Sequence, residues 1–111
     1  MTTFEIFRRN NGRYYYRTIA DSGHNLLSSD GFETKQECLR AIREAKENIM
    51  NTDKIKLEKL PEKEYKFILH GNGDNIVGYS MNFHSEKQCK KWIGIMQHSF
   101  PGSEITEIAK L

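Results

Sequence analysis

The stretch FETKQECLRAI at residues 32–42 has a counterpart 51 residues later, FHSEKQCKKWI at residues 83–93. In each stretch a Ser or Thr stands two residues after a Phe, and a Glu or Gln follows the hydroxyl residue by three positions. This spacing is that of a capping box, in which the hydroxyl accepts a hydrogen bond from a backbone N–H at the start of a helix. The two stretches therefore predict two helices that begin in the same way.

Apolar residues behind both boxes recur at intervals of three and four, which places them on one stripe of a helix. The stripes consist of Cys38, Ala41, Ile42, Ala45 and Ile49 in the first helix, and of Cys89, Trp92, Ile93, Met96 and Phe100 in the second. The first helix is expected to end near Met50, and the second before Pro101, because proline does not continue a helix.

Alternating aromatic and polar residues predict a strand before each helix, at residues 14–19 and 65–70. Residues that tolerate positive φ indicate turns at 10–12, 22–23 and 72–74. Each half of the chain therefore reads strand, turn, strand, turn, strand, helix. Residues 54–57 are expected to begin the second half, and the closing segment 104–108 fits either a last strand or a helix.

We expect an α+β fold in which two tandem β-β-β-α repeats, residues 1–53 and 54–111, form one antiparallel sheet with two helices packed on one face. The 111 residues make a single domain in this interpretation. The length excludes large enzyme scaffolds such as an eight-fold barrel or a complete dinucleotide-binding fold.

Charge and cysteine content give no sign of a specialised environment. Seventeen Lys and Arg against fifteen Asp and Glu leave a net charge of +2. Residues 1–53 are neutral and residues 54–111 carry nine basic against seven acidic residues, so neither half is the basic arm typical of dedicated nucleic-acid domains. Two cysteines make no disulfide framework, and neither a signal core nor an apolar run long enough to span a membrane is present. We expect a cytoplasmic protein with no membrane association and no cofactor.

Several of these stretches resemble the YegP-like family of small proteins. The resemblance rests on LLSSDGF at 26–32 with Thr34, Lys35, Cys38 and Ile42, and on YKFIL at 65–69 with Asn72, Gly73, Ile76, Val77, Ser80, Phe83, Ser85 and Ile93. It implies a duplicated unit in which the strand after each helix pairs with the other half, and single-repeat relatives that reach the same arrangement by dimerising. It implies no activity.

The chain departs from the family pattern in its strands. Thr18 stands where the family has Leu, and Ile19 and His70 stand where Lys is common. A role for that Lys in relatives would therefore be absent here.

The sheet face opposite the helices is the predicted binding surface. Beside Phe7, it carries Tyr15, Arg17, Ile19, Lys66, Ile68 and His70, a mixture of apolar and basic side chains. Our first hypothesis is an interaction module that binds a protein partner or a second copy through this face. The alternative is weak nucleic-acid binding through the same aromatic and basic residues. The remaining interpretation of this face is that its apolar residues are scattered over the surface and have no role.

Cys38 and Cys89 support a third functional hypothesis, a cysteine-based redox or enzymatic role. Both stand near helix N-termini, where the helix dipole lowers a thiol pKa. Both also lie on the apolar stripes, one turn before Ile42 and Ile93, which favours buried, inert thiols. The four histidines show no metal-ligand spacing, so the sequence predicts no metal site and no catalytic residue.

Overall fold

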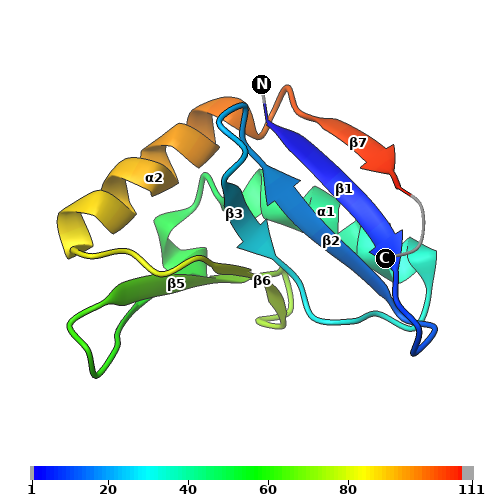
Figure 1. Cartoon of the computed structure of the whole chain (residues 1–111), viewed down its shortest axis with the longest axis horizontal. Coiled ribbons are helices and arrows are strands. Elements are labelled where there is room, and N and C mark those ends of the chain that lie inside the picture. Colours follow the sequence, from blue (N-terminus) through cyan, green and yellow to red (C-terminus); the bar gives the residue numbers. More distant parts are fainter. Residues whose placement is uncertain (1, 109–111) are drawn as a thin grey trace.

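A computed structural model describes residues 2–108. Its elements, in chain order, are β1 (Thr3–Arg8), β2 (Tyr14–Ile19), β3 (Asn25–Ser28), α1 (Lys35–Asn48), the 3-10 helix η1 (Thr52–Lys54), β4 (Ile55–Lys59), β5 (Tyr65–His70), β6 (Ile76–Ser80), α2 (Glu86–Ser99) and β7 (Glu104–Glu107). The fold is α+β, with one sheet of seven strands in the order β4-β5-β6-β3-β2-β1-β7 (Figure 1).

The sheet is mixed, so the prediction of a purely antiparallel sheet is wrong at one strand. β7 runs parallel to β1, from Thr3 opposite Glu104 to Ile6 opposite Glu107, while the other pairings are antiparallel. The direction follows from where α2 ends. Ser99 accepts a hydrogen bond from the hydroxyl of Thr2 at 2.9 Å, so the chain leaves α2 beside the start of β1 and then runs along it in the same direction.

Both predicted N-cap hydroxyl bonds are present. The hydroxyl of Thr34 accepts from the N–H of Glu37 at 3.1 Å, and that of Ser85 accepts from the N–H of Gln88 at 3.1 Å. The side chain of Gln88 reaches back to the N–H of His84, at 3.0 Å, which is one residue before the cap. The helix ends agree with the predicted ones within two residues.

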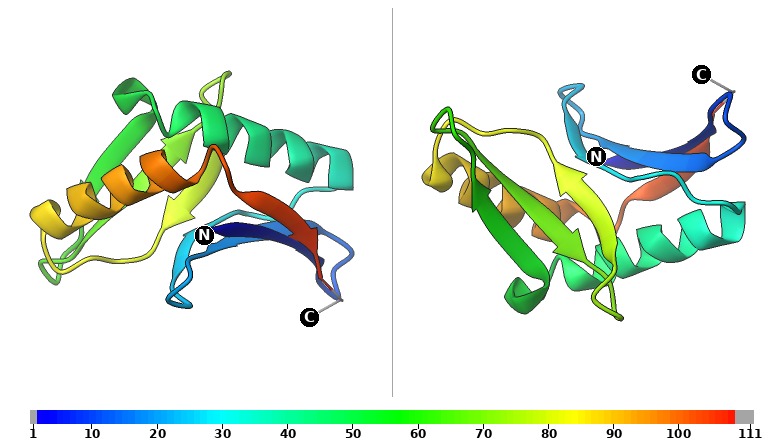
Figure 2. Two further views of the ribbon diagram at one scale, coloured as in Figure 1. Left: turned by 90° about the horizontal axis from the view of Figure 1, so that it is seen from above. Right: turned by 90° about the horizontal axis from the view of Figure 1, so that it is seen from below.

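The two helical stripes and the inner sheet face form one hydrophobic core. Phe100, at the end of α2, packs edge-on against Phe4 of β1 with ring centroids 4.9 Å apart. The strands form two groups, β4 to β6 and β1 to β3 with β7. Figure 2 shows these two groups inclined to each other with the helices packed against them. Of the predicted stripe residues, Trp92 alone is only partly buried.

The two groups of strands meet where β3 pairs with β6. This pairing is short, with Leu27 opposite Ser80 and Ser28 opposite Tyr79. Gly78 allows the close approach, because a Cβ at this position would lie 2.7 Å from Cγ of Leu27. The hydroxyl of Tyr16 donates to the backbone carbonyl of Val77 across the same seam.

Each group of strands contains one irregularity of register. The shift falls between Thr18 and Ile19 in the pairing of β2 with β3, and between Leu69 and His70 in the pairing of β5 with β6. A bulge of this kind increases the local twist of a sheet.

No helix among residues 2–108 combines the length and the apolar character that a bilayer crossing demands.

Candidate interaction surface on the open sheet face

The predicted binding residues lie on two strands that are not neighbours. Tyr15, Arg17 and Ile19 belong to β2, and the other three predicted residues belong to β5. They alternate with core residues, so their side chains point away from the helices. Because β3 and β6 lie between β2 and β5, about 14 Å separates the two strands at ordinary strand spacing. The structure therefore separates the predicted site into one part on β2 and another on β5.

The first cluster, which we call the Arg-aromatic cluster, consists of Glu5, Phe7, Arg9, Tyr15 and Arg17. The rings of Phe7 and Tyr15 stack with centroids 5.8 Å apart and an interplanar angle of 12°. The guanidinium of Arg9 lies 5.4 Å from the ring centroid of Phe7 and 5.0 Å from that of Tyr15. Arg17 lies 5.4 Å from Phe7 and its Nε donates to the carboxylate of Glu5 at 2.8 Å. The chain's own cations therefore cover the aromatic rings of this cluster.

Tyr15 is fixed in this position from two further sides. Its hydroxyl accepts a hydrogen bond from the side-chain amide of Asn11 at 2.8 Å. The ring also lies directly against Gly31, where a Cβ would come within 2.8 Å of Cζ of Tyr15. Together with the stacked ring of Phe7, these contacts hold the Tyr15 side chain in this position.

The second cluster lies on β5 and β6 and, like the first, places a cation over an aromatic ring. The ammonium of Lys66 lies 5.7 Å from the ring centroid of Tyr79, and Ile68 is buried beside them on this face. Tyr79 donates its hydroxyl proton to Asp30 at 3.0 Å, and burial together with this hydrogen bond raises the pKa of Tyr79. Asp30 follows β3, so this contact ties the second cluster to the first group of strands.

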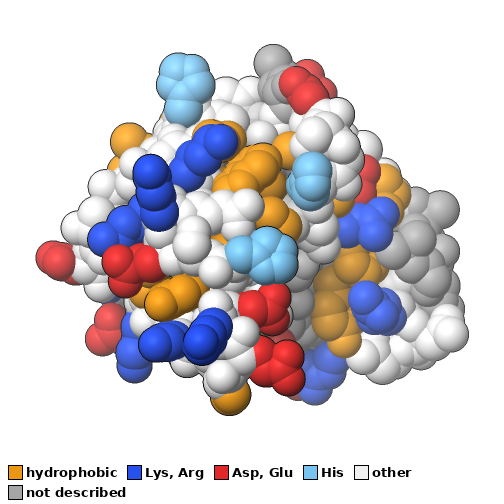
Figure 3. Space-filling view, turned by 60° about the vertical axis from the view of Figure 1, so that its left-hand side comes forward, with side chains coloured by type: hydrophobic (Ala, Val, Ile, Leu, Met, Phe, Trp, Pro, Cys, Tyr) orange, Lys and Arg blue, Asp and Glu red, His pale blue; other side chains and the backbone are white. Residues whose placement is uncertain are grey.

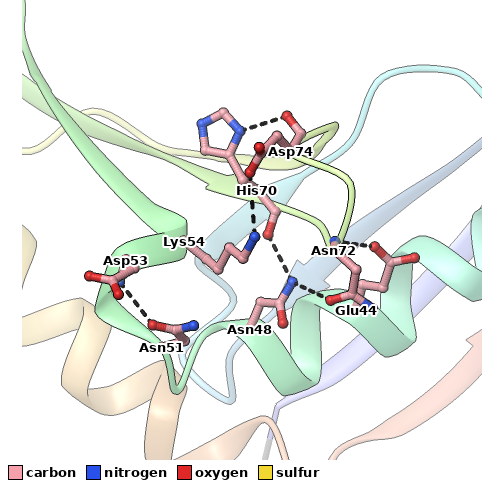
Figure 4. A network of polar contacts seen from close by, with 8 residues as sticks. All are labelled: Glu44, Asn48, Asn51, Asp53, Lys54, His70, Asn72 and Asp74. Carbon is pink, nitrogen blue, oxygen red and sulfur yellow. Dashed lines mark hydrogen bonds and ion pairs between the residues drawn. The ribbon is translucent and has the colours of Figure 1, made fainter.

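His70 takes part in a different structure, at the turn between β5 and β6 (Figure 4). Its Nδ1 lies 3.1 Å from the backbone oxygen of Asp74 in the turn. Its own carbonyl accepts from the side-chain amide of Asn48 at 3.0 Å, which links the end of β5 to α1. The structure therefore places this predicted binding residue in an anchored turn rather than in either cluster.

The turn is anchored on α1 by buried side chains. The carboxylate of Glu44 is buried and accepts from the backbone N–H of Asn72 at 2.8 Å, and Asn48 donates to the side-chain oxygen of Asn72 at 3.1 Å. Lys54 closes the other side of the turn through an ion pair with Asp74 at 3.4 Å. These contacts are typical of a structural anchor.

Both cysteines are completely buried and unpaired. Burial raises the pKa of the Cys38 thiol to about 12 and that of the Cys89 thiol to about 11, where the neighbouring Glu86 adds to the effect of burial. Burial thus outweighs the helix dipole at both sites. Among residues 2–108, no group of three or more His, Cys, Asp or Glu side chains converges in a way that could hold a metal ion.

Sequence reasoning did not include Glu5, Arg9, Asp30 and Tyr79 in the candidate site. The period-two pattern did carry a signal for Glu5, which alternates with Phe4 and Ile6. It carried none for Tyr79, because the register irregularity between β5 and β6 breaks the alternation with Val77, which belongs to the core. Arg9 and Asp30 come from loops, whose side-chain directions have no such period.

Comparison with known proteins gives a family and no activity. No family model matches the chain. A UPF0339 protein from the 5' region of the ptx operon of Stutzerimonas stutzeri is 26% identical over 106 residues, which cover 96% of both chains. A UPF0339 protein of Methanosarcina acetivorans is 33% identical over 58 residues, which are 52% of this chain and all of that protein. The chain belongs to the UPF0339 family.

Solved structures of UPF0339 proteins share its fold. The solution structure of a UPF0339 protein from Shewanella oneidensis has a TM-score of 0.90 at 17% identity, over 97% of this chain and 92% of the other. That of YegP from E. coli, a protein of unknown function, has a TM-score of 0.89 at 14% identity, over 97% and 93%. The resemblance to the YegP-like family is thus confirmed, and no relative's activity passes to this chain.

Proposed function

We propose that this UPF0339 protein is a small non-enzymatic interaction module that binds an acidic segment of a protein partner through its open sheet face. The observation that carries the proposal is the Arg-aromatic cluster, where Arg9 and Arg17 lie over Phe7 and Tyr15. Guanidinium groups held against rings keep their planar N–H forks available at the edges, and these forks match carboxylates. Arg17 already donates through its Nε to one carboxylate, that of Glu5.

Ring coverage favours a protein partner over nucleic acid. Single-strand binders stack bases on free aromatic faces. Phe7 is only 5% exposed, with Tyr15 stacked on it and both arginines over it, so it offers no such platform. Self-association through this face is also less favoured, because only one of the five large exposed apolar side chains of the described residues, Ile76 opposite His70, lies on it. On the side of the molecule seen in Figure 3, hydrophobic side chains form separate patches with charged side chains between them.

We also infer that residues 1–53 and 54–111 are two copies of one β-β-β-α unit joined in a single domain. The half-length relative from Methanosarcina supports this inference, because all of it aligns with about half of the present chain. Contacts 51 residues apart support it too. The N–H of Tyr16 donates to Ser29 Oγ at 2.9 Å, and the N–H of Phe67 donates to Ser80 Oγ at 2.8 Å.

A cytoplasmic location is part of this proposal. Two unpaired thiols in a small domain fit a reducing compartment, since small secreted domains commonly use cysteines for disulfides. The cysteine-based redox or enzymatic hypothesis has little support in the structure, because both thiols are inaccessible.

The test is a titration of isotope-labelled protein, followed by amide chemical shifts, with two ligands of equal charge: a glutamate-rich peptide and an oligothymidylate. The proposal expects shifts around Arg9, Tyr15 and Arg17 with the peptide and much smaller ones with the nucleic acid. Arg9→Glu should abolish the peptide shifts, whereas Arg40→Glu, an exposed arginine on α1, should retain them. Stronger binding of the oligothymidylate would establish the nucleic-acid alternative, and concentration-dependent shifts without ligand would indicate self-association.

A further inference from the structure

β7 fills a groove between β1 and α1. It pairs with β1, and α1 holds it from the other side, because Lys35 forms an ion pair with Glu107 and Lys46 donates to the carbonyl of Ser103 at 2.8 Å. Figure 2 shows this strand (red) along β1 on the side that faces α1. Beneath it, Phe4 and Ile6 of β1 are almost completely buried.

A second groove of the same construction lies between β4 and α2. β4 ends the sheet order, and no strand among residues 2–108 pairs with its outer edge. Ile55 and Leu57, which stand 51 residues after Phe4 and Ile6, are only half-buried here. They line a pocket of about 340 Å³, together with Ile93, Gly94 and Gln97 of α2. Gln97 stands 51 residues after Lys46.

Gly94 keeps this groove open. It lies within α2, where glycine is less favourable than alanine, and a Cβ there would meet no atom within 4 Å. Close packing therefore does not require glycine at this position. Any larger side chain on this face of α2 would instead project into the pocket.

We propose that the groove between β4 and α2 binds an extended segment of a partner protein, which adds as a strand to the free edge of β4 as β7 adds to β1. The proposal uses the inferred duplication but is independent of the open sheet face, since no pocket residue belongs to the clusters there. Backbone hydrogen bonds to the edge supply affinity, and the pocket accepts one apolar side chain of the segment.

Charge and the chain's own β7 define the chemistry of the segment. Lys90 lies at the pocket, and its side chain is 64% exposed, with only a loose ion pair of 3.4 Å to Glu86. A carboxylate on the segment would find this cation, as Glu107 of β7 finds Lys35 on α1. The expected segment therefore combines apolar and acidic residues, as residues 104–108 (EITEI) do.

A peptide of residues 103–108 (SEITEI) is the probe. Titration of the labelled full chain with it should move amide signals of β4 and of residues 90–97, with a dissociation constant on the order of 0.1–1 mM for so short a strand. Gly94→Leu should weaken binding by about tenfold or more while the protein stays folded. Lys91→Leu, an exposed change on α2 outside the pocket, should leave binding unchanged.

Lys90→Glu gives a second variant that does not depend on filling the pocket, and it should weaken binding by about tenfold. Signals that move only on the open sheet face, or no movement at several millimolar peptide, would overturn the proposal. Unchanged affinity in Gly94→Leu or Lys90→Glu would also overturn it. Signals of the groove that move with protein concentration alone would identify a second copy of the chain as the occupant and would overturn it as well. None of these outcomes bears on the effect of Arg9→Glu on binding at the open sheet face. The failure of one proposal can therefore be told apart from the failure of the other.

Discussion

Among residues 2–108, Thr18 alone has a buried side-chain polar atom without a hydrogen-bond partner. It is completely buried on β2, at the position where the YegP-like pattern has Leu. A buried hydroxyl without a partner costs about 1–3 kcal/mol of desolvation. Thr18→Val keeps the shape of the side chain and should raise the free energy of unfolding by about 1 kcal/mol, as measured by urea denaturation. Thr106→Val on the exposed β7 is the control and should change little, and a destabilised Thr18→Val protein would contradict the prediction.

The cysteines give a prediction about reactivity and pH. Because burial raises the pKa values of Cys38 and Cys89 from 9.0 to about 12 and about 11, the folded protein keeps both thiols protonated at neutral pH. Labelling with a thiol reagent at pH 7.5 should be at least about 100-fold slower than that of a free cysteine, and complete in denaturant. The unfolded thiols lose protons near pH 9, before the folded ones, so their contribution to stability is full below that pH and declines as pH rises toward 11 or 12. One fast-labelling cysteine at pH 7.5 would restore the redox hypothesis.

At the scale of elements, local signals in the sequence were sufficient to predict where the helices begin. The sequence carried no signal for contacts between distant parts of the chain. Thr34 and Ser85 predicted the helix starts because a cap is satisfied by the next three residues. The direction of β7 could not be predicted, because it depends on Ser99 ending beside Thr2, a contact across 97 positions. The same limit applies to the binding surface, where alternation predicted which residues of β2 and β5 face outward but could not show that two strands separate them.

The turn between β5 and β6 gives a prediction at the same scale. A Cβ on Gly71 would lie 2.4 Å from the Glu44 carboxylate and 2.8 Å from Cγ1 of Val77, whereas a Cβ on Gly73 would meet its nearest atom at 3.7 Å. Gly71→Ala should therefore cost about 2 kcal/mol through overpacking, and Gly73→Ala should cost much less. Thermal unfolding of the two variants makes the comparison. Equal melting temperatures would show that Glu44 moves away freely and does not anchor the turn.

The whole molecule depends on a short seam that joins two groups of strands over one core. The paired backbone between β3 and β6 covers two residue pairs, so side chains must supply much of the coupling, and Tyr16 reaches across to the carbonyl of Val77. Burial raises the pKa of Tyr16, so the hydroxyl remains a donor over the accessible pH range.

Tyr16→Phe removes this donor from the buried carbonyl of Val77, which should lower the free energy of unfolding by about 1–3 kcal/mol. Since Phe4, Phe100 and both helices share the core, the loss should reach both halves alike. Native-state hydrogen exchange measures this: amides of β2 and of β5 should open with the same reduced free energy. Tyr65→Phe changes a tyrosine at the edge of the core and provides the control, since it should leave the opening free energies near those of the unaltered protein. Faster exchange confined to β1–β3 would mean that the halves unfold independently, and the seam would then be a contact between two folding units rather than the middle of one.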